Sequence, residues 1–148
     1  MSVLCPPEML TLILRLKLFE GLVESELSEL LSLAEMIECE KDDFIIREGE
    51  QGHHLFVLLA GSARITKRSM GIQKIIQTLA PGECFGEMSL IECRTRSASV
   101  RALSHCKLLR IDGENITQLP NISARIYRNI AILLSRRLRH ANEVLTLG

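Results

Sequence analysis

Short β-rich segments separated by glycines occupy the middle of this 148-residue chain, and they constrain its fold more than any other feature. The strand candidates are residues 44–46, 55–60, 63–67, 72–79, 98–100 and 108–111. Glycines at 49, 52, 61, 71, 82 and 86 punctuate them, and Ser69-Met70-Gly71 is a candidate hairpin turn. Strands this short and this regularly spaced favour a β-barrel or a jelly roll.

Two helices are expected before the strands. After Pro6-Pro7, apolar residues at 10, 13, 14 and 16 predict a short helix that stops near Gly21. A second helix is predicted from Ser25, as its N-cap, to about Met36, because leucines at 27, 30 and 31 and Ala34 repeat every three or four residues. Both helices have one apolar face, which we expect to pack on the larger β-rich body.

The last third of the chain returns to a helical pattern. Asp112 or Asn115 is expected to cap a short segment that ends before Pro120, and a long helix is predicted from residue 123 to 145. Its apolar stripe consists of Ile126, Ile130, Leu133, Leu134, Leu138, Ala141 and Leu145. This stripe is interpreted as core, or alternatively as a seam that pairs two such helices in a homodimer. The arginines at 125, 128, 136, 137 and 139 are interpreted as a solvated face, with a partner or nucleic-acid surface as the alternative.

Length and composition limit the functional classes. The chain has the length of one domain, and its 18 basic and 18 acidic residues cancel, which gives no support for a surface that coats nucleic acid or membrane. The longest apolar run near the N-terminus, residues 9–14, is far too short to span a bilayer. Five dispersed cysteines without a C-x-x-C pair argue against a disulfide scaffold or an iron–sulfur cluster. We therefore expect a cytoplasmic protein.

The segment from Phe85 to Val100 contains the residues of a compact anion site. Within eleven residues it places Gly86, Glu87 and Arg96. Glycine lets the backbone turn with its N–H groups exposed, a carboxylate accepts hydrogen bonds from a vicinal diol, and a guanidinium forks onto phosphate oxygens. The implied ligand is a sugar phosphate. Because the segment holds no histidine and no nucleophile beside a base, binding without turnover is expected, and no catalytic residue is assigned.

The order of elements and the glycine frame resemble the cyclic-nucleotide-binding domain family, found in catabolite-activator-type regulators, cyclic-nucleotide-dependent kinases and gated channels. The match includes R-E-G-E at 47–50, L-A-G-S at 59–62, P-G-E-C-F-G-E at 81–87 and F-G-E-M-S-L followed by R-S-A-S-V. The resemblance implies an α+β fold, in which a β-roll of the jelly-roll type carries N-terminal helices and a long C-terminal helix. It implies one domain over residues 1–148, with helices in 1–36, the roll in 37–111, the phosphate-binding cassette in 85–97 and lid or dimerisation helices in 112–148.

The resemblance also implies site residues for cyclic AMP or cyclic GMP, and neither a metal nor a further cofactor. The residues are Gly86, Glu87, Met88, Ser89, Arg96, Ser97 and, on the C-terminal helix, Asn142. By position, Gly86 opens the cassette, Met88 and Ser89 add backbone N–H groups, and Ser97 contacts phosphate or base. Glu87 would take the ribose 2′-hydroxyl, Arg96 the exocyclic phosphate oxygens and Asn142 the base, with the C-terminal helix as a signalling lid. The choice between the two purines stays open.

Some positions depart from the family pattern, and two other functions were weighed. Thr95 and Cys93 replace the proline and glycine that relatives often carry, and His53-His54 stands at a position read as a turn. One alternative is a ligand-free module that dimerises or docks partners. The other is a metal-dependent enzyme using the histidines at 53, 54, 105 and 140. No direct DNA binding is expected, because the chain ends soon after the long helix, and no membrane partner is expected.

Overall fold

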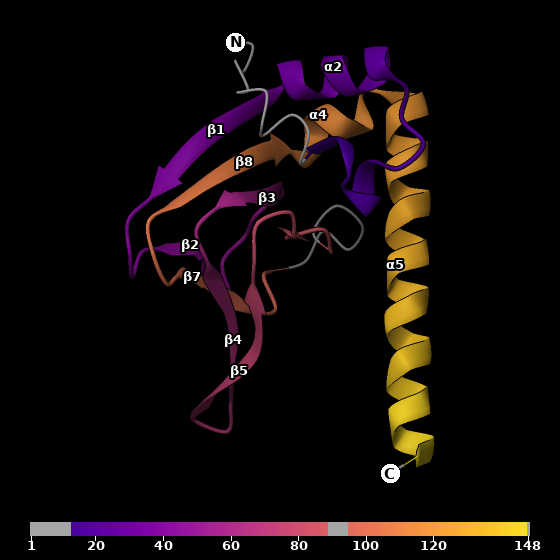
Figure 1. Ribbon diagram of the computed structural model, residues 1–148. Helices are drawn as coiled ribbons and strands as arrows, with labels where there is room; N and C mark the ends of the chain where they lie inside the picture. Colours follow the sequence, from indigo (N-terminus) through magenta and orange to yellow (C-terminus); the bar gives the residue numbers. More distant parts are fainter. Residues whose placement is uncertain (1–12, 89–94, 148) are drawn as a thin grey trace.

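The computed structural model describes residues 13–88 and 95–147, which form two four-stranded antiparallel sheets with helices along one side (Figure 1). The first sheet has the order β1 (Ala34–Cys39), β8 (Cys106–Asp112), β3 (His54–Ala60) and β6 (Cys84–Phe85). The second has the order β2 (Phe44–Ile46), β7 (Ser99–Ala102), β4 (Ala63–Ser69) and β5 (Ile72–Leu79). The helical elements are η1 (Lys17–Phe19), α2 (Glu24–Ser32), α4 (Gly113–Thr117) and α5 (Pro120–Leu147). The predicted α+β fold, a β-roll with N-terminal helices and a long C-terminal helix, is confirmed.

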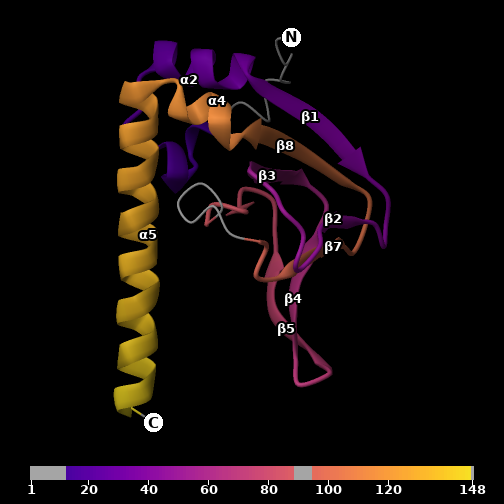
Figure 2. The same cartoon turned by 180° about the vertical axis from the view of Figure 1, so that it is seen from behind.

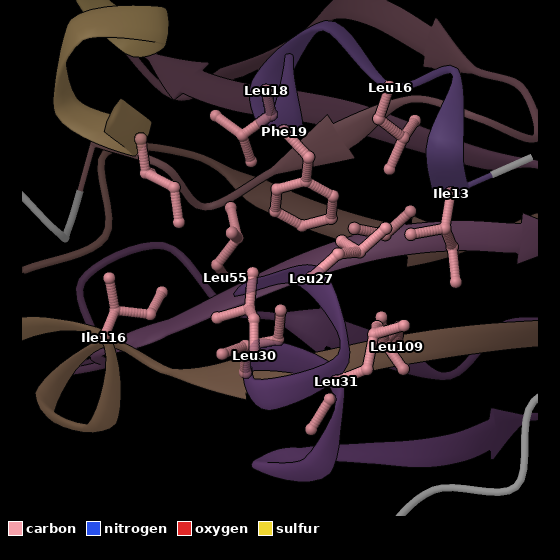
Figure 3. Close-up of a cluster of buried hydrophobic side chains, with 14 of the residues drawn as sticks. Ile13, Leu16, Leu18, Phe19, Leu27, Leu30, Leu31, Leu55, Leu109 and Ile116 are labelled. Carbon is pink, nitrogen blue, oxygen red and sulfur yellow. The ribbon is translucent and has the colours of Figure 1, made fainter. Parts of the chain in front are cut away.

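Strand β3 separates two hydrophobic cores. Successive side chains of a strand point to opposite faces, so Leu55, Val57 and Leu59 pack toward the helices while Phe56 and Leu58 face the space between the sheets. Figure 3 shows the first core, in which Leu55 lies close to Leu27, Leu30 and Ile116. Each such side chain contributes about 1.5–3 kcal/mol on burial. A strand buried on both faces gives the roll a rigid centre, against which the rest of the molecule is positioned.

The second predicted helix is shorter than expected. Helix α2 begins at Glu24 after an N-cap at Val23, whose backbone N–H donates to the Glu26 carboxylate at 3.0 Å, so Ser25 is not the cap. The helix ends at Ser32, and Ala34 starts strand β1, so the predicted continuation to Met36 was wrong. The physical reason is tertiary, because this segment pairs in register with β8, with Ala34 opposite Ile111.

The C-terminal helices follow the prediction more closely. Of the two proposed caps for α4, Asp112 is confirmed, since its side chain accepts from the N–H of Glu114 at 2.9 Å. The N-terminal half of α5 packs on the core through Ile122, Ile126 and Ile130, whereas its C-terminal half runs on beside the roll with no other helix of the described residues against it (Figures 1 and 2). Among the helices of residues 13–88 and 95–147, none has the length and apolarity needed to cross a membrane.

Buried Asn129 anchors α5 to the N-terminal segment. Its side-chain amide donates to the backbone carbonyls of Leu18 at 2.7 Å and Glu20 at 2.9 Å. Because buried carbonyls are costly to leave without donors, these bonds tie the η1 turn to the long helix. The N-terminal half of α5 is therefore attached both to the core and to the segment that contains η1.

The predicted hairpin between β4 and β5 is confirmed. Strand β4 ends at Ser69 and β5 begins at Ile72, and the two turn residues, Met70 and Gly71, have positive φ angles of 53° and 77°. Strands β1 and β6 were not among the predicted strands. β6 is only two residues long, but its Phe85 stacks on Phe56 of β3 with ring centroids 5.2 Å apart. This stack fixes the residue that immediately precedes Gly86.

Candidate ligand-binding site

A pocket of about 170 Å³ lies where the two sheets approach the segment after β6. Its walls include the apolar side chains of Ile46, Ile65, Leu79 and Val100 from the second sheet. Five of the seven predicted site residues line it together: Gly86, Glu87, Met88, Arg96 and Ser97. The pocket thus combines an apolar wall with a polar part that carries the Glu87 carboxylate and the guanidinium groups of Arg96 and Arg137.

Arg96 is half-buried and is held by backbone carbonyl groups. Its guanidinium donates to the carbonyl oxygen of His54 at 2.9 Å and to that of Gly86 at 3.3 Å. Its backbone is bonded to the turn before β3, with Arg96 N–H to the Glu50 carbonyl and Gly49 N–H to the Arg96 carbonyl, both at 2.8 Å. Burial lowers the pKa of Arg96, while the nearby Glu87 carboxylate opposes that shift. A guanidinium stays protonated at neutral pH, so these contacts aim a positive charge into the pocket.

Two glycines make room for this guanidinium. A Cβ atom at Gly52 would lie 2.6 Å from the Arg96 Nε, and one at Gly86 would lie 3.1 Å from its Nη1 and 2.8 Å from the His54 carbonyl oxygen. Gly86 also has a φ of +82°, which L side chains rarely adopt. The role of Gly86 could be read from the motif. The role of Gly52 could not, because it stands 44 positions before the arginine that it accommodates.

Glu87 points into the pocket and meets α5. Its side chain is only 12% exposed, and its Oε1 accepts from the Arg137 Nη1 at 3.2 Å. Arg137 belongs to the arginine set that was assigned to a solvated face, and its side chain is 58% exposed, but it also lines the pocket. The long helix therefore touches the cassette directly, fifty residues away in the sequence.

The remaining predicted residues differ in position. Met88 and Ser97 both lie at the pocket with exposed side chains, whereas Ser89 lies outside the described residues. Asn142 is exposed on α5 and is not among the residues that line this pocket in the described part of the chain. His54, assigned to a turn, is the first residue of β3, and its carbonyl oxygen receives the Arg96 guanidinium.

Cys84 lines the pocket beside the cassette. Burial raises the pKa of its thiol to about 12, and the neighbouring Glu87 carboxylate adds to this effect. A thiol with such a pKa stays protonated at neutral pH and does not act as a nucleophile. Within residues 13–88 and 95–147, no three side chains of His, Cys, Asp or Glu are grouped as a metal ion would require.

Comparisons of sequence and of structure both match this chain to proteins that contain cyclic nucleotide-binding domains. The family model described as cyclic nucleotide-binding domain matches residues 36–122. The chain is 34% identical over 131 residues to the cyclic AMP receptor protein of Thermus thermophilus, covering 88% of this chain and 61% of that protein. It is 36% identical over 104 residues to human cGMP-dependent protein kinase 2, covering 68% of this chain and 14% of the kinase. The chain thus spans less than two thirds of these relatives.

Solved structures resemble this fold closely. The crystal structure of the Thermus thermophilus catabolite activator protein superposes with a TM-score of 0.79 at 33% identity, covering 88% of this chain and 62% of that one. The regulatory domain of Toxoplasma gondii PKA, co-crystallised with cAMP, superposes with a TM-score of 0.71 at 28% identity, covering 75% of this chain and 43% of that one.

Proposed function

The chain belongs to the cyclic nucleotide-binding domain family, and from this premise we propose that it binds a purine cyclic nucleotide, cAMP or cGMP, as a non-catalytic sensor or regulatory domain. The observation that carries the proposal is the placement of Arg96 beside Gly86 and Glu87 at the polar end of one pocket. A cyclic phosphodiester has one negative charge, which matches the one positive charge left when the Glu87 carboxylate is set against the guanidinium groups of Arg96 and Arg137. The apolar wall opposite suits the flat faces of a purine.

The phosphate and the ribose have separate partners in this proposal. Arg96 neutralises the phosphate, and backbone N–H groups after Gly86 complete its binding. Glu87 would repel a phosphate, so it has to face the sugar. Its Oε1 is engaged by Arg137, and its Oε2 is the acceptor we assign to the ribose 2′-hydroxyl. The ion pair keeps the carboxylate oriented and partly neutralised, so that it can be buried next to an anionic ligand.

Through its ion pair with Glu87, Arg137 connects the proposed ligand site to α5. A nucleotide that settles between Arg96 and Glu87 changes the field around the Glu87–Arg137 pair, which is the contact between cassette and helix. Because Asn129 fixes the first half of α5, the second half is the part that we propose to move as a lid. The signal is then the difference in contacts that this half makes with and without ligand.

We also propose a homodimer formed through the second half of α5, with action in the cytoplasm and no contact of this domain with DNA or membrane. The support for the dimer is the apolar stripe of α5, in which Leu138 is 64% exposed. A helix that leaves a large apolar side chain of its stripe in solvent can bury it against the same helix of a second copy. The cytoplasmic assignment rests on the ligand class and on cysteines that are free in the described residues.

Calorimetric titration with cAMP and with cGMP tests the proposal. We expect saturable binding of at least one nucleotide, weakened about 10- to 100-fold in Arg96→Ala, because a charge-assisted hydrogen bond contributes about 1.5–3 kcal/mol. Arg101→Ala is the matched control, since Arg101 pairs with Asp42 at 3.7 Å and does not line the pocket. A folded protein that ignores both nucleotides at millimolar concentration would overturn the proposed function.

A further inference from the structure

Gln77 is the polar side chain on the β5 wall of the pocket. It stands opposite Ile65 of β4 in the strand register and two positions before Leu79. Residues two apart on a strand, and residues directly opposite on its neighbour, project from the same face. Since Ile65 and Leu79 both line the pocket, the alternation accounts for the presence of Gln77 there.

Glu83 fixes the orientation of the Gln77 amide. The Gln77 Nε2 donates to the Glu83 Oε2 at 2.8 Å, and the Glu83 Oε1 accepts from the backbone N–H of Ala80 at 3.2 Å. A carboxylate only accepts hydrogen bonds, so the amide group that faces it has to be the NH₂ group. The other end of the amide is its carbonyl oxygen, Oε1. Gln77 is thus held with a donor committed to Glu83 and an acceptor left for a ligand.

The base of a bound nucleotide belongs at this wall. Gly86, Glu87 and Arg96 form the polar end that suits phosphate and ribose. The second sheet supplies an apolar wall for the purine through Ile46, Ile65, Leu79 and Val100, and Gln77 is the polar side chain on that wall. A purine that lies between these apolar side chains keeps its edge polar, and that edge needs a hydrogen-bond partner.

We infer that Gln77 reads the 6-position of the purine as an acceptor, and that the pocket therefore prefers cAMP to cGMP; this rests on the proposed function. Adenine carries a 6-amino donor, whereas guanine carries a 6-oxo acceptor. The Gln77 carbonyl oxygen bonds to the first and faces the second with a like dipole. A mismatched polar pair in a partly buried site costs more than a missing contact.

The other polar groups of the pocket do not reverse this preference. Arg137 is a donor that would suit a 6-oxo group, but the Glu87 carboxylate engages it at 3.2 Å. The Ser97 hydroxyl both donates and accepts, so it tolerates either base. The hydrogen bond from the Gln77 Nε2 to Glu83 orients the Gln77 amide, so that Gln77 can offer only its carbonyl oxygen, an acceptor, to the base.

Calorimetry with cAMP, cIMP and cGMP tests the inference on the full chain. Cyclic IMP has the 6-oxo group and the N1–H of cGMP without its 2-amino group, so the ratio of cAMP to cIMP affinity removes the 2-amino group from the comparison. We expect cAMP to bind about tenfold more tightly than cIMP, which corresponds to one hydrogen bond of about 1.4 kcal/mol. Gln77→Leu should bring the ratio near one, and Gln77→Arg, which presents only donors, should invert it.

Two further variants distinguish recognition of the base by Gln77 from a general effect of the substitutions on the fold. Glu83→Gln removes the obligate acceptor, so the Gln77 amide can turn over, and the ratio should fall while cAMP still binds. Gln73→Leu is the control, because Gln73 lies on the same strand and donates to Thr66 at 3.1 Å without lining the pocket. Binding of all three nucleotides at a ratio that Gln77→Leu leaves unchanged would overturn this inference alone. Binding of none would overturn the proposed function and this inference with it.

Discussion

At the scale of single residues, the site depends on what holds Arg96 in place. Backbone carbonyls of His54 and Gly86 orient it, and the Glu87 carboxylate is near enough to affect its pKa. These contacts hold the guanidinium at the polar end of the pocket, beside Gly86, which is where an anionic ligand would meet it.

Gly52→Ala tests whether the space beside Arg96 is functional. The added Cβ would lie 2.6 Å from the Arg96 Nε, and the atom that has to give way is in a flexible side chain rather than in the backbone. We expect nucleotide affinity to fall about tenfold with little loss of thermal stability, measured by calorimetry and thermal melts. The control is Gly71→Ala, which has open space but a φ of +77°, and which should lower stability by about 1–2 kcal/mol without affecting affinity. The reverse pattern would contradict this account.

Glu87 should make the site sensitive to the ribose 2′-hydroxyl. We expect 2′-deoxy-cAMP to bind about tenfold more weakly than cAMP, because the Glu87 Oε2 loses its proposed donor while Oε1 keeps Arg137. Competition binding measures the ratio, and Glu87→Ala should reduce it to near one. Equal discrimination in wild type and in Glu87→Ala would show that another group reads the sugar.

At the scale of elements, α5 combines two different attachments. Its first half is buried and carries the Asn129 clamp, whereas the second half meets the cassette through Arg137, whose side chain is 58% exposed. Exposed ion pairs contribute roughly 0–1 kcal/mol. The second half is therefore weakly held, which is what a helix that responds to ligand requires.

Arg137→Ala should loosen that half alone. We expect amide hydrogen exchange over residues 134–143 to become roughly two- to fivefold faster, in line with the loss of an exposed ion pair, with no change around Asn129. Arg136→Ala serves as the control, because Arg136 lines a separate surface with Lys17. Equal effects of the two variants would argue against a specific contact with Glu87.

The sequence predicted most of the strands but not β1 or β6, and the boundary between α2 and β1 shows why β1 was missed. Leu27, Leu30 and Leu31 have helical spacing and are buried on one face of α2, which ends at Ser32. Ala34 fits the same period, but it starts strand β1 and stands opposite Ile111 of β8, 77 positions later. Periodicity within one segment contains no information about that partner.

At the scale of the whole molecule, the raised pKa of the pocket residue Cys84 makes the free energy of unfolding depend on pH in the alkaline range. Its thiol pKa is raised to about 12 in the folded protein, against about 8.5 for a free thiol. The folded state therefore keeps a proton that the unfolded state releases, so the contribution to stability is fully present below about pH 8.5 and is lost as pH rises toward 12.

Unfolding by denaturant at pH 8, 9 and 10 tests whether stability falls with rising pH, as the raised pKa of Cys84 predicts. We expect the free energy of unfolding to fall with rising pH, with Cys84 contributing a slope that approaches about 1.4 kcal/mol per pH unit. In Cys84→Ala the slope should be smaller by up to that amount, whatever the variant does to stability at pH 8. Parallel curves for the two proteins would show that Cys84 does not carry the effect.

The candidate site was predictable to the extent that it is contiguous. Gly86, Glu87, Met88, Arg96 and Ser97 fall within twelve residues of sequence, and the pocket brings them together. The sequence did not indicate Gln77 and Arg137, which line the pocket, or Gly52, which lies beside the Arg96 guanidinium, because each lies outside the cassette in the sequence. The residues next to Gly52 do not indicate that it makes room for Arg96. Arg137 stands among other arginines of α5, and the sequence does not distinguish it from them.

The sequence by itself determined the turns, the long amphipathic helix and the cassette, since each depends on residues within one or two turns of chain. Only the tertiary structure decided that residues 34–39 form a strand, that the His54 carbonyl orients Arg96, and that Arg137 meets Glu87. These contacts join residues 42 to 77 positions apart, with Ala34 and Ile111 at the far end of that range. The physical reason is that a side chain's partner across such distances depends on how the elements pack, and packing depends on the two cores as a whole.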